Sequence, residues 1–114
     1  MSDLLKKKCK PCEGGITPFE IKEIHKYQKK VDGWDVLIGD KNIYYLQKIF
    51  KFEDFKRSLD FINNIGNISE EEGHHPDSNF GWGYAKINIT THAIEGLSEN
   101  DFILAAKIDK IFNV

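Results

Sequence analysis

Residues 53–76, EDFKRSLDFINNIGNISEEEGHHP, decide the fold because they contain the pattern of a long helix followed by a stop. Apolar side chains recur there every three or four residues with polar side chains between them, which is typical of an amphipathic helix. The helix is expected to end near Gly73, since the ring of Pro76 disfavours helical geometry at the residue before it. The periodicity assigns these side chains to the core: Phe55, Leu59, Ile62 and Ile65.

Two strands are predicted before this helix. Apolar side chains alternate with their neighbours over residues 34–38, and residues 43–52 are rich in aromatic and branched side chains. Residues 39–42 supply the turn between them, so the strands are expected to run antiparallel. The sequence also allows a short additional strand at residues 39–45.

A first helix is predicted where the chain has the sequence TPFE at residues 17–20. Thr17 suits the N-cap, Pro18 suits the first helical position, and the Glu20 carboxylate can accept from a free backbone N–H. This helix is expected to run to about Lys30.

A third strand is predicted at about residues 82–91. Its apolar residues Ala85, Ile87 and Ile89 fall on one face, because side chains alternate along a strand. If the alternation continues, His92 lies on the polar side.

The last helix is predicted to begin after Ser98, a cap residue, and to reach about residue 112. Asp101 stands three residues after Ser98, as a capping box requires. The order α-β-β-α-β-α then gives an α+β fold, an antiparallel sheet of three to four strands with helices on one face. Because open sheet edges invite pairing, a homodimer or homotetramer is expected.

The length and composition indicate one folded domain. A chain of 114 residues is long enough for one core and too short for two. Residues 1–15 have no apolar period and are expected to form an N-terminal tail, which leaves residues 16–114 as the domain. The net charge of -2 provides no broad basic field, so direct binding to nucleic acid is not expected.

The sequence also bears on location. No apolar run approaches the roughly 20 residues that span a bilayer, and the first residues lack the pattern of a signal peptide. We therefore expect a cytoplasmic protein that does not bind membranes.

Three of the four histidines, His74, His75 and His92, lie within a short stretch and are the candidate catalytic residues. Imidazole groups titrate near neutral pH and so can donate and accept protons. The carboxylates of Glu70 and Asp101 lie near them in the sequence and can orient an imidazole. The sequence offers no motif for a serine or cysteine nucleophile.

Other interpretations of these residues remain open at this stage. The His-His-Pro segment can be a polar turn, and His92 can be a buried histidine without chemistry. Zinc is a further alternative, because histidine pairs and the Cys9–Cys12 pair supply ligands of the right type. The cysteine pair lacks the strand and helix that frame a thioredoxin-like redox motif, and it has no second pair at zinc-finger spacing.

The motif His74-His75-Pro76, with Thr91-His92 and Gly96-Leu97-Ser98 after it, resembles that of the pterin-4a-carbinolamine dehydratase family. This family is also called the dimerization cofactor of a homeodomain transcription factor. A weaker resemblance in residues 50–55 extends the similarity over nearly all of the chain after Gly14. The resemblance implies a hydro-lyase that eliminates water from 4a-hydroxytetrahydrobiopterin and gives quinonoid dihydropterin.

The resemblance also implies roles for individual residues. His74 and His92 would serve as the general acid and base, and His75 would mainly position the pterin. No metal and no bound organic cofactor are implied. The remaining implied substrate-binding residues are Glu70, Pro76, Thr91, Ala93, Ile94 and Asp101.

Two further expectations come from the family. Its members recycle tetrahydrobiopterin, which implies a functional link to an aromatic amino acid hydroxylase. Some members bind a protein partner, so the alternative is a non-catalytic dimerization cofactor of the same fold. The chain departs from some relatives at Gly73, where they carry aspartate, so either Glu70 or Glu72 substitutes for that carboxylate or the rate differs.

Overall fold

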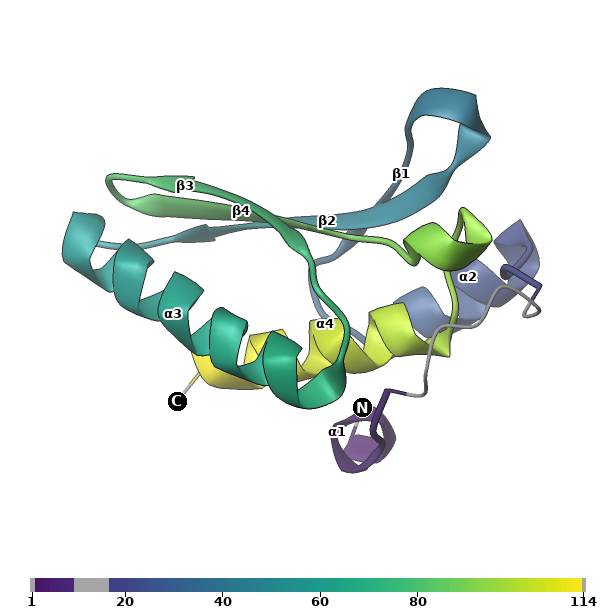
Figure 1. The fold of residues 1–114 in the computed structure, drawn as a ribbon, viewed down its shortest axis with the longest axis horizontal. Coiled ribbons are helices and arrows are strands. Elements are labelled where there is room, and N and C mark those ends of the chain that lie inside the picture. The colour runs from purple at the N-terminus through teal and green to yellow at the C-terminus, as the bar shows by residue number, and fades with distance from the viewer. Residues whose placement is uncertain (1, 10–16, 114) are drawn as a thin grey trace.

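The fold is an antiparallel sheet with helices on one of its faces (Figure 1). The computed structural model describes residues 2–9 and 17–113. Four strands pair in the order β1-β2-β4-β3, which confirms the predicted α+β class. The elements are α1 (Ser2–Lys6), α2 (Ile21–Gln28), β1 (Asp35–Ile38), the 3-10 helix η1 (Asp40–Asn42), β2 (Tyr44–Lys51), α3 (Phe55–Glu72), β3 (Asp77–Gly81), β4 (Tyr84–Ile89), the 3-10 helix η2 (His92–Ile94) and α4 (Glu99–Phe112).

The inner face of the sheet forms the floor of the core. Ala85, Ile87 and Ile89 of β4 are all 0% exposed, as the alternation predicts. In the register of β2 and β4, Leu46 lies opposite Ile89 and Phe50 lies opposite Ala85. Helices α3 and α4 cover this face and leave the other face of the sheet open (Figure 1). A functional site can therefore lie on the open face of the sheet or at the ends of the strands.

The fourth strand, β3, lies at a place that the sequence did not indicate. Residues 39–45 contain the 3-10 helix η1 and the start of β2, so the additional strand allowed there is wrong. The sequence DSNFG of β3 has no apolar alternation, because this edge strand is held by backbone pairing with β4 and most of its side chains face solvent. As a result, the segment from Gly73 to Pro76 leads directly from α3 into the sheet.

The long helix begins and ends where the sequence predicts. The Asp54 side chain caps its start by accepting from the Arg57 N–H at 2.9 Å, and Gly73 ends it with φ of 67°. Its buried face is different, however: Phe55 is 47% exposed, and Leu59 and Ile62 are only half-buried. The small Ser58 and Ser69 side chains are buried instead. The buried residues of α3 are Ser58, Phe61, Ile65 and Ser69.

The first helix of the domain is shorter than predicted. It begins at Ile21 rather than Pro18 and ends at Gln28 rather than about Lys30. The physical reason is that the backbone N–H of Phe19 donates to the Leu97 carbonyl at 2.8 Å. Residues 17–20 are thereby held against the chain just before α4 and do not form a first helical turn.

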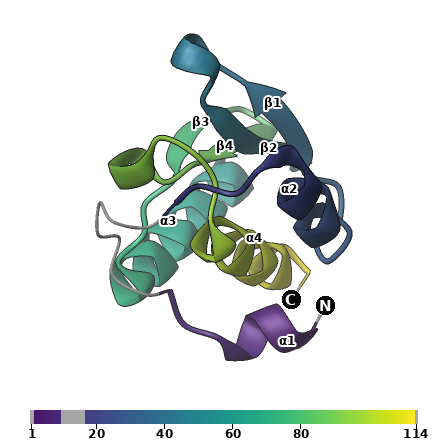
Figure 2. The same ribbon diagram turned by 90° about the vertical axis from the view of Figure 1, so that its right-hand side faces the viewer.

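The N-terminal helix α1 lies beneath α4, on the side away from the sheet (Figure 2). Leu4 is only 1% exposed, and the backbone N–H of Cys9 donates to Glu72 at 2.8 Å. Cys12, the second cysteine of the pair, lies outside the described residues. The domain boundary near residue 16 also falls outside them and stays a prediction. In the described part of the chain, no helix has the length and apolar character needed to cross a membrane.

Helix α4 is tied to the sheet by a buried polar cluster. Its Asp109 carboxylate accepts from Trp34 Nε1 at 3.0 Å and from Lys48 Nζ at 2.8 Å. Burial raises the pKa of Asp109, although the two donors act in the opposite direction. This cluster lies almost three helical turns from the start of α4, where the candidate site begins.

Candidate functional site

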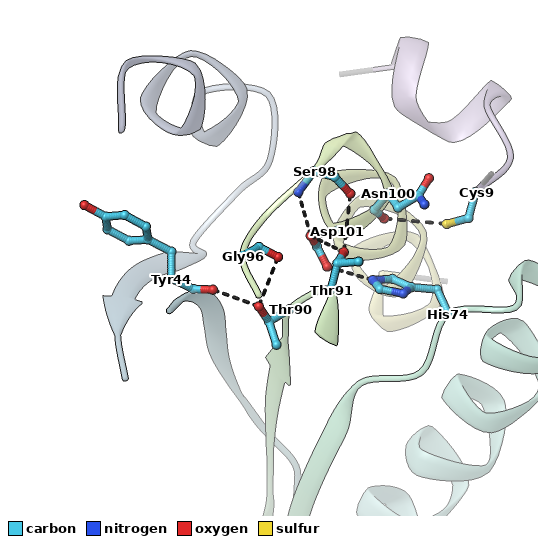
Figure 3. Close-up of polar contacts among 9 residues, drawn as sticks. All are labelled: Cys9, Tyr44, His74, Thr90, Thr91, Gly96, Ser98, Asn100 and Asp101. Atoms are coloured by element: carbon cyan, nitrogen blue, oxygen red, sulfur yellow. Dashed lines mark hydrogen bonds and ion pairs between the residues drawn. The ribbon is translucent and has the colours of Figure 1, made fainter. Parts of the chain in front are cut away.

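His74 is buried against the start of α4 (Figure 3). It follows the left-handed Gly73, and its backbone N–H donates to the Ser69 carbonyl at 3.2 Å. Its ring Nε2 lies 2.7 Å from Oδ1 of Asp101. Because a carboxylate accepts this bond, the neutral ring carries its proton on Nε2 and has a free lone pair on Nδ1.

The Asp101 carboxylate is the centre of the site, with 0% exposure. Its second oxygen, Oδ2, accepts from the Thr91 hydroxyl and from the Ser98 backbone N–H, both at 2.8 Å. Ser98 and Asp101 form the predicted capping box at the start of α4. The three hydrogen bonds leave the carboxylate one orientation, so it holds His74 and Thr91 at fixed positions.

The loop that carries His92 is closed at its base. Thr91 and Gly96 form an isolated antiparallel bridge, with hydrogen bonds of 2.9 and 3.3 Å. The hydroxyl of Thr90 lies 2.8 Å from the Tyr44 carbonyl oxygen and 3.2 Å from that of Gly96 (Figure 3). At Gly96 a Cβ would lie 2.7 Å from Pro18, so the close approach of the two segments requires glycine.

The residues at the tip of this loop are open to solvent. His92 and Ala93 are exposed and Ile94 is half-buried. The placement of His92 agrees with the expectation that it lies on the polar side. Thr91, the residue before His92, bonds to the same buried carboxylate as His74, so this cluster holds the backbone next to His92.

His75 points away from this cluster. Its ring pairs with the Glu70 carboxylate from the last turn of α3, and both side chains are exposed. Pro76 after it is half-buried. Adjacent residues in an extended segment face opposite sides, which explains why one histidine of the pair is buried and the other is not.

A hollow of about 350 Å³ lies beside His92 on the open face of the sheet. His92 lines it, whereas His74 and His75 do not. Of the residues that line it, His92 alone was a candidate from the sequence. The residues that line the hollow are Gly39, Asp40, Ile43, Tyr45, Asp77, Asn88, Thr90 and His92.

Glu72 does not take the place of the aspartate that some relatives carry at Gly73. Its side chain accepts from Lys107 at 2.6 Å and from the Cys9 N–H at 2.8 Å, away from the histidines. Burial acts to raise the pKa of Glu72, but these two hydrogen bonds outweigh it and lower the pKa. Glu70 is therefore the carboxylate of α3 that reaches a histidine.

Cys9 has no features of a reactive thiol. Its Sγ lies 3.5 Å from the Asn100 carbonyl oxygen, and burial together with the Glu72 charge raises the pKa of Cys9 to about 12. The thiol is protonated at neutral pH and is a poor nucleophile. Within residues 2–9 and 17–113, no three histidine, cysteine, aspartate or glutamate side chains are grouped so that they could hold a metal ion.

Comparison with known proteins gives a consistent match. The family model described as pterin 4 alpha carbinolamine dehydratase matches residues 17–111. A protein of Rubrobacter xylanophilus named pterin-4-alpha-carbinolamine dehydratase is 42% identical over 97% of this chain and 100% of its own length. A protein of Rickettsia canadensis with the same name is 48% identical, over 96% of this chain and 97% of its own.

Solved structures match the fold. A transcriptional coactivator/pterin dehydratase from Brucella melitensis superposes with a TM-score of 0.75 at 24% identity, over 83% of this chain and 98% of that one. A pterin dehydratase-like protein identified as a RuBisCO assembly factor in the alpha-carboxysome gives a TM-score of 0.59 at 29% identity. That alignment covers 69% of this chain and 88% of the other.

Proposed function

Because the chain belongs to the pterin 4 alpha carbinolamine dehydratase family, we propose that it eliminates water from 4a-hydroxytetrahydrobiopterin and releases quinonoid dihydropterin. The observation that carries the proposal is the buried pair of His74 and Asp101, whose carboxylate also holds Thr91, the residue before His92. A carboxylate that orients an imidazole is a common arrangement for acid and base catalysis.

The reaction needs two proton transfers. One group protonates the departing hydroxyl at C4a, and another removes the proton from N5. The C4a–O bond then breaks as the N5 electron pair forms the C4a–N5 double bond, and water leaves. Two histidine side chains, one acting as acid and one as base, can provide both steps.

In this proposal His74 and His92 perform the two transfers. Since Asp101 occupies Nε2 of His74, only Nδ1 of that ring can exchange a proton with the substrate. His92 is exposed on a loop with a closed base, so its ring is accessible while its backbone is held. His75, oriented by Glu70, positions the pterin, and Pro76 with the backbone of residues 91–94 lines the ring.

The wider role that we propose follows from the same family. The product is reduced again to the tetrahydropterin that aromatic amino acid hydroxylases consume, in the cytoplasm.

We also propose a homodimer or homotetramer, because large apolar side chains are exposed on this small domain, with Trp82 at 72% and Phe55 at 47%. Light scattering of the purified protein tests this state, and a monomer at working concentration would contradict it.

The function is tested by following the loss of the 4a-carbinolamine with purified protein. The wild type should accelerate dehydration, and His74→Gln and His92→Gln should each reduce kcat by roughly 10²-fold or more. His25→Gln is the matched control, because His25 lies on α2, where its recorded hydrogen bond is to Gln28. Unchanged rates in both site variants would refute the assignment, and no acceleration by the wild type would refute the function.

The alternative of a non-catalytic dimerization cofactor is less well supported. The chain keeps all three histidines and the carboxylates that orient two of them, Glu70 and Asp101. A purely structural role would not require these pairs. A stoichiometric protein partner together with absent turnover would reverse this ranking.

A further inference from the structure

The hollow beside His92 is formed by three parts of the chain that are far apart in the sequence. Asp77 of β3 and Asn88 of β4 lie opposite each other in the strand register and contribute the open face of the sheet. Tyr45 of β2 and Asp40 of the β1–β2 turn line it as well. The turn is closed by a hydrogen bond from the Ile43 N–H to the Asp40 carbonyl at 3.2 Å. These walls belong to the sheet and a tight turn, so the hollow is preformed.

Polar side chains of the hollow can form hydrogen bonds with a ligand. Oδ1 of Asn88 accepts from Gln47 Nε2 at 3.0 Å, which fixes the amide and leaves its NH₂ group as a donor. Among the described residues, neither Asp40 nor Asp77 has a salt bridge or a side-chain hydrogen bond. Two carboxylates that accept hydrogen bonds thus share the hollow with an amide donor.

The charge of the lining selects the kind of group that can enter. Among the residues that the structure describes, no lysine or arginine lines the hollow, and its two carboxylates repel anions. A phosphate or a carboxylate is therefore a poor ligand. A neutral group with several hydroxyls is a good one, because each hydroxyl can donate to a carboxylate and accept from the amide. The volume of about 350 Å³ is at the lower end of the roughly 300–1,000 Å³ typical of small-molecule pockets.

The chemistry of the substrate indicates what reaches this hollow. Proton transfer by His92 requires its ring to lie at the C4a–N5 edge of the pterin. The next ring atom after N5 is C6, which carries the side chain, a dihydroxypropyl group in the biopterin series. His92, Asp77 and Asn88 line the same hollow, so a side chain on the ring atom next to N5 can reach Asp77 and Asn88.

We propose that this hollow binds the hydroxylated C6 side chain of the carbinolamine, with Asp77 and Asn88 as the residues that determine specificity for it. The inference rests on the proposed dehydratase function and adds to it the residues that recognise the neutral hydroxylated side chain of the substrate. The two residues act on binding of the side chain and take no part in proton transfer.

The test compares two substrates in one enzyme. The first is the 4a-carbinolamine of tetrahydrobiopterin, and the second is that of 6-methyltetrahydropterin, which has no side-chain hydroxyl. Asp77→Asn, an isosteric change, should raise KM for the first by about tenfold and leave kcat unchanged. Asn88→Ala should raise it by roughly fivefold. Neither variant should change KM for the methyl compound.

Asn79→Ala is the matched control, because Asn79 lies on the same face of β3, opposite Lys86, and does not line the hollow. It should leave KM for both substrates unchanged. An equal rise in KM for both substrates, or no rise for either, would overturn the inference while the wild-type turnover upholds the function. Absence of wild-type turnover with both substrates would instead refute the dehydratase function, and the inference with it.

Discussion

Replacing Asp101 with asparagine is the most informative single change, because three donors converge on its two buried oxygens. Asparagine has the same shape but only one acceptor oxygen. If that oxygen faces Thr91 and the Ser98 N–H, the new NH₂ group faces His74. The ring must then accept at Nε2 and carry its proton on Nδ1, which is the wrong tautomer for a base.

The magnitudes follow from this geometry. Loss of a correctly protonated general base typically costs about 10²–10⁴-fold in kcat. A buried site with a mismatched donor is destabilised by roughly 1–3 kcal/mol. We therefore expect Asp101→Asn to remain folded, with a lower free energy of unfolding and a kcat reduced by at least about 10²-fold. Denaturant unfolding and the dehydration assay measure the two effects separately.

Asp109→Asn provides the matched control. It removes a second buried carboxylate from the same helix, where Asp109 accepts from Trp34 and Lys48, far from the histidines. It should lower the free energy of unfolding by a similar roughly 1–3 kcal/mol and leave kcat of the folded enzyme unchanged. Equal losses of kcat in both variants, or no loss in Asp101→Asn, would refute the role given to the pair of Asp101 and His74.

Two further predictions concern stability. Phe61 is 4% exposed and packs against Phe50, so Phe61→Ala should cost about 3–5 kcal/mol in urea unfolding, whereas Phe55→Ala should cost much less because Phe55 is 47% exposed. The pKa of Glu72 is lowered in the fold by Lys107, so its contribution is present at neutral pH and is lost as the pH falls through the folded pKa. The urea midpoint of Glu72→Gln should therefore decline less on acidification than that of the wild type; a parallel decline would contradict this.

Local patterns predicted the parts of the fold that depend on local physics. The stop at Gly73 and the capping box of Ser98 and Asp101 involve residues within a few positions of each other, so the sequence contains the whole cause. The alternation also predicted correctly that Ala85, Ile87 and Ile89 are buried, because successive side chains of a strand point to opposite faces of the sheet.

The predictions of secondary structure were wrong where contacts with residues far away in the sequence determine the structure. The cap signals at Thr17 and Pro18 were overruled because the Phe19 N–H bonds to Leu97, which periodicity cannot reveal. The buried face of α3 differs from the predicted one because it includes two small serines, Ser58 and Ser69, which an apolar pattern does not count. Strand β3 was missed because its polar side chains face solvent.

The candidate site shows the same division. The resemblance located His74 and His92, but their connection through Asp101 and Thr91 depends on where α4 meets the end of β4. Asp77 follows the His-His-Pro motif directly and was still missed. Its significance depends on its register with Asn88, which no local pattern in this edge strand indicates.

A structure with bound 7,8-dihydrobiopterin, a stable analogue of the product, tests the central claim most directly. The account predicts that the C4a–N5 edge of the ring lies within hydrogen-bonding distance of Nδ1 of His74 and of the His92 ring, with the side-chain hydroxyls on Asp77 and Asn88. A pterin bound away from His74 and His92, or with its C4a–N5 edge turned to solvent, would contradict the account.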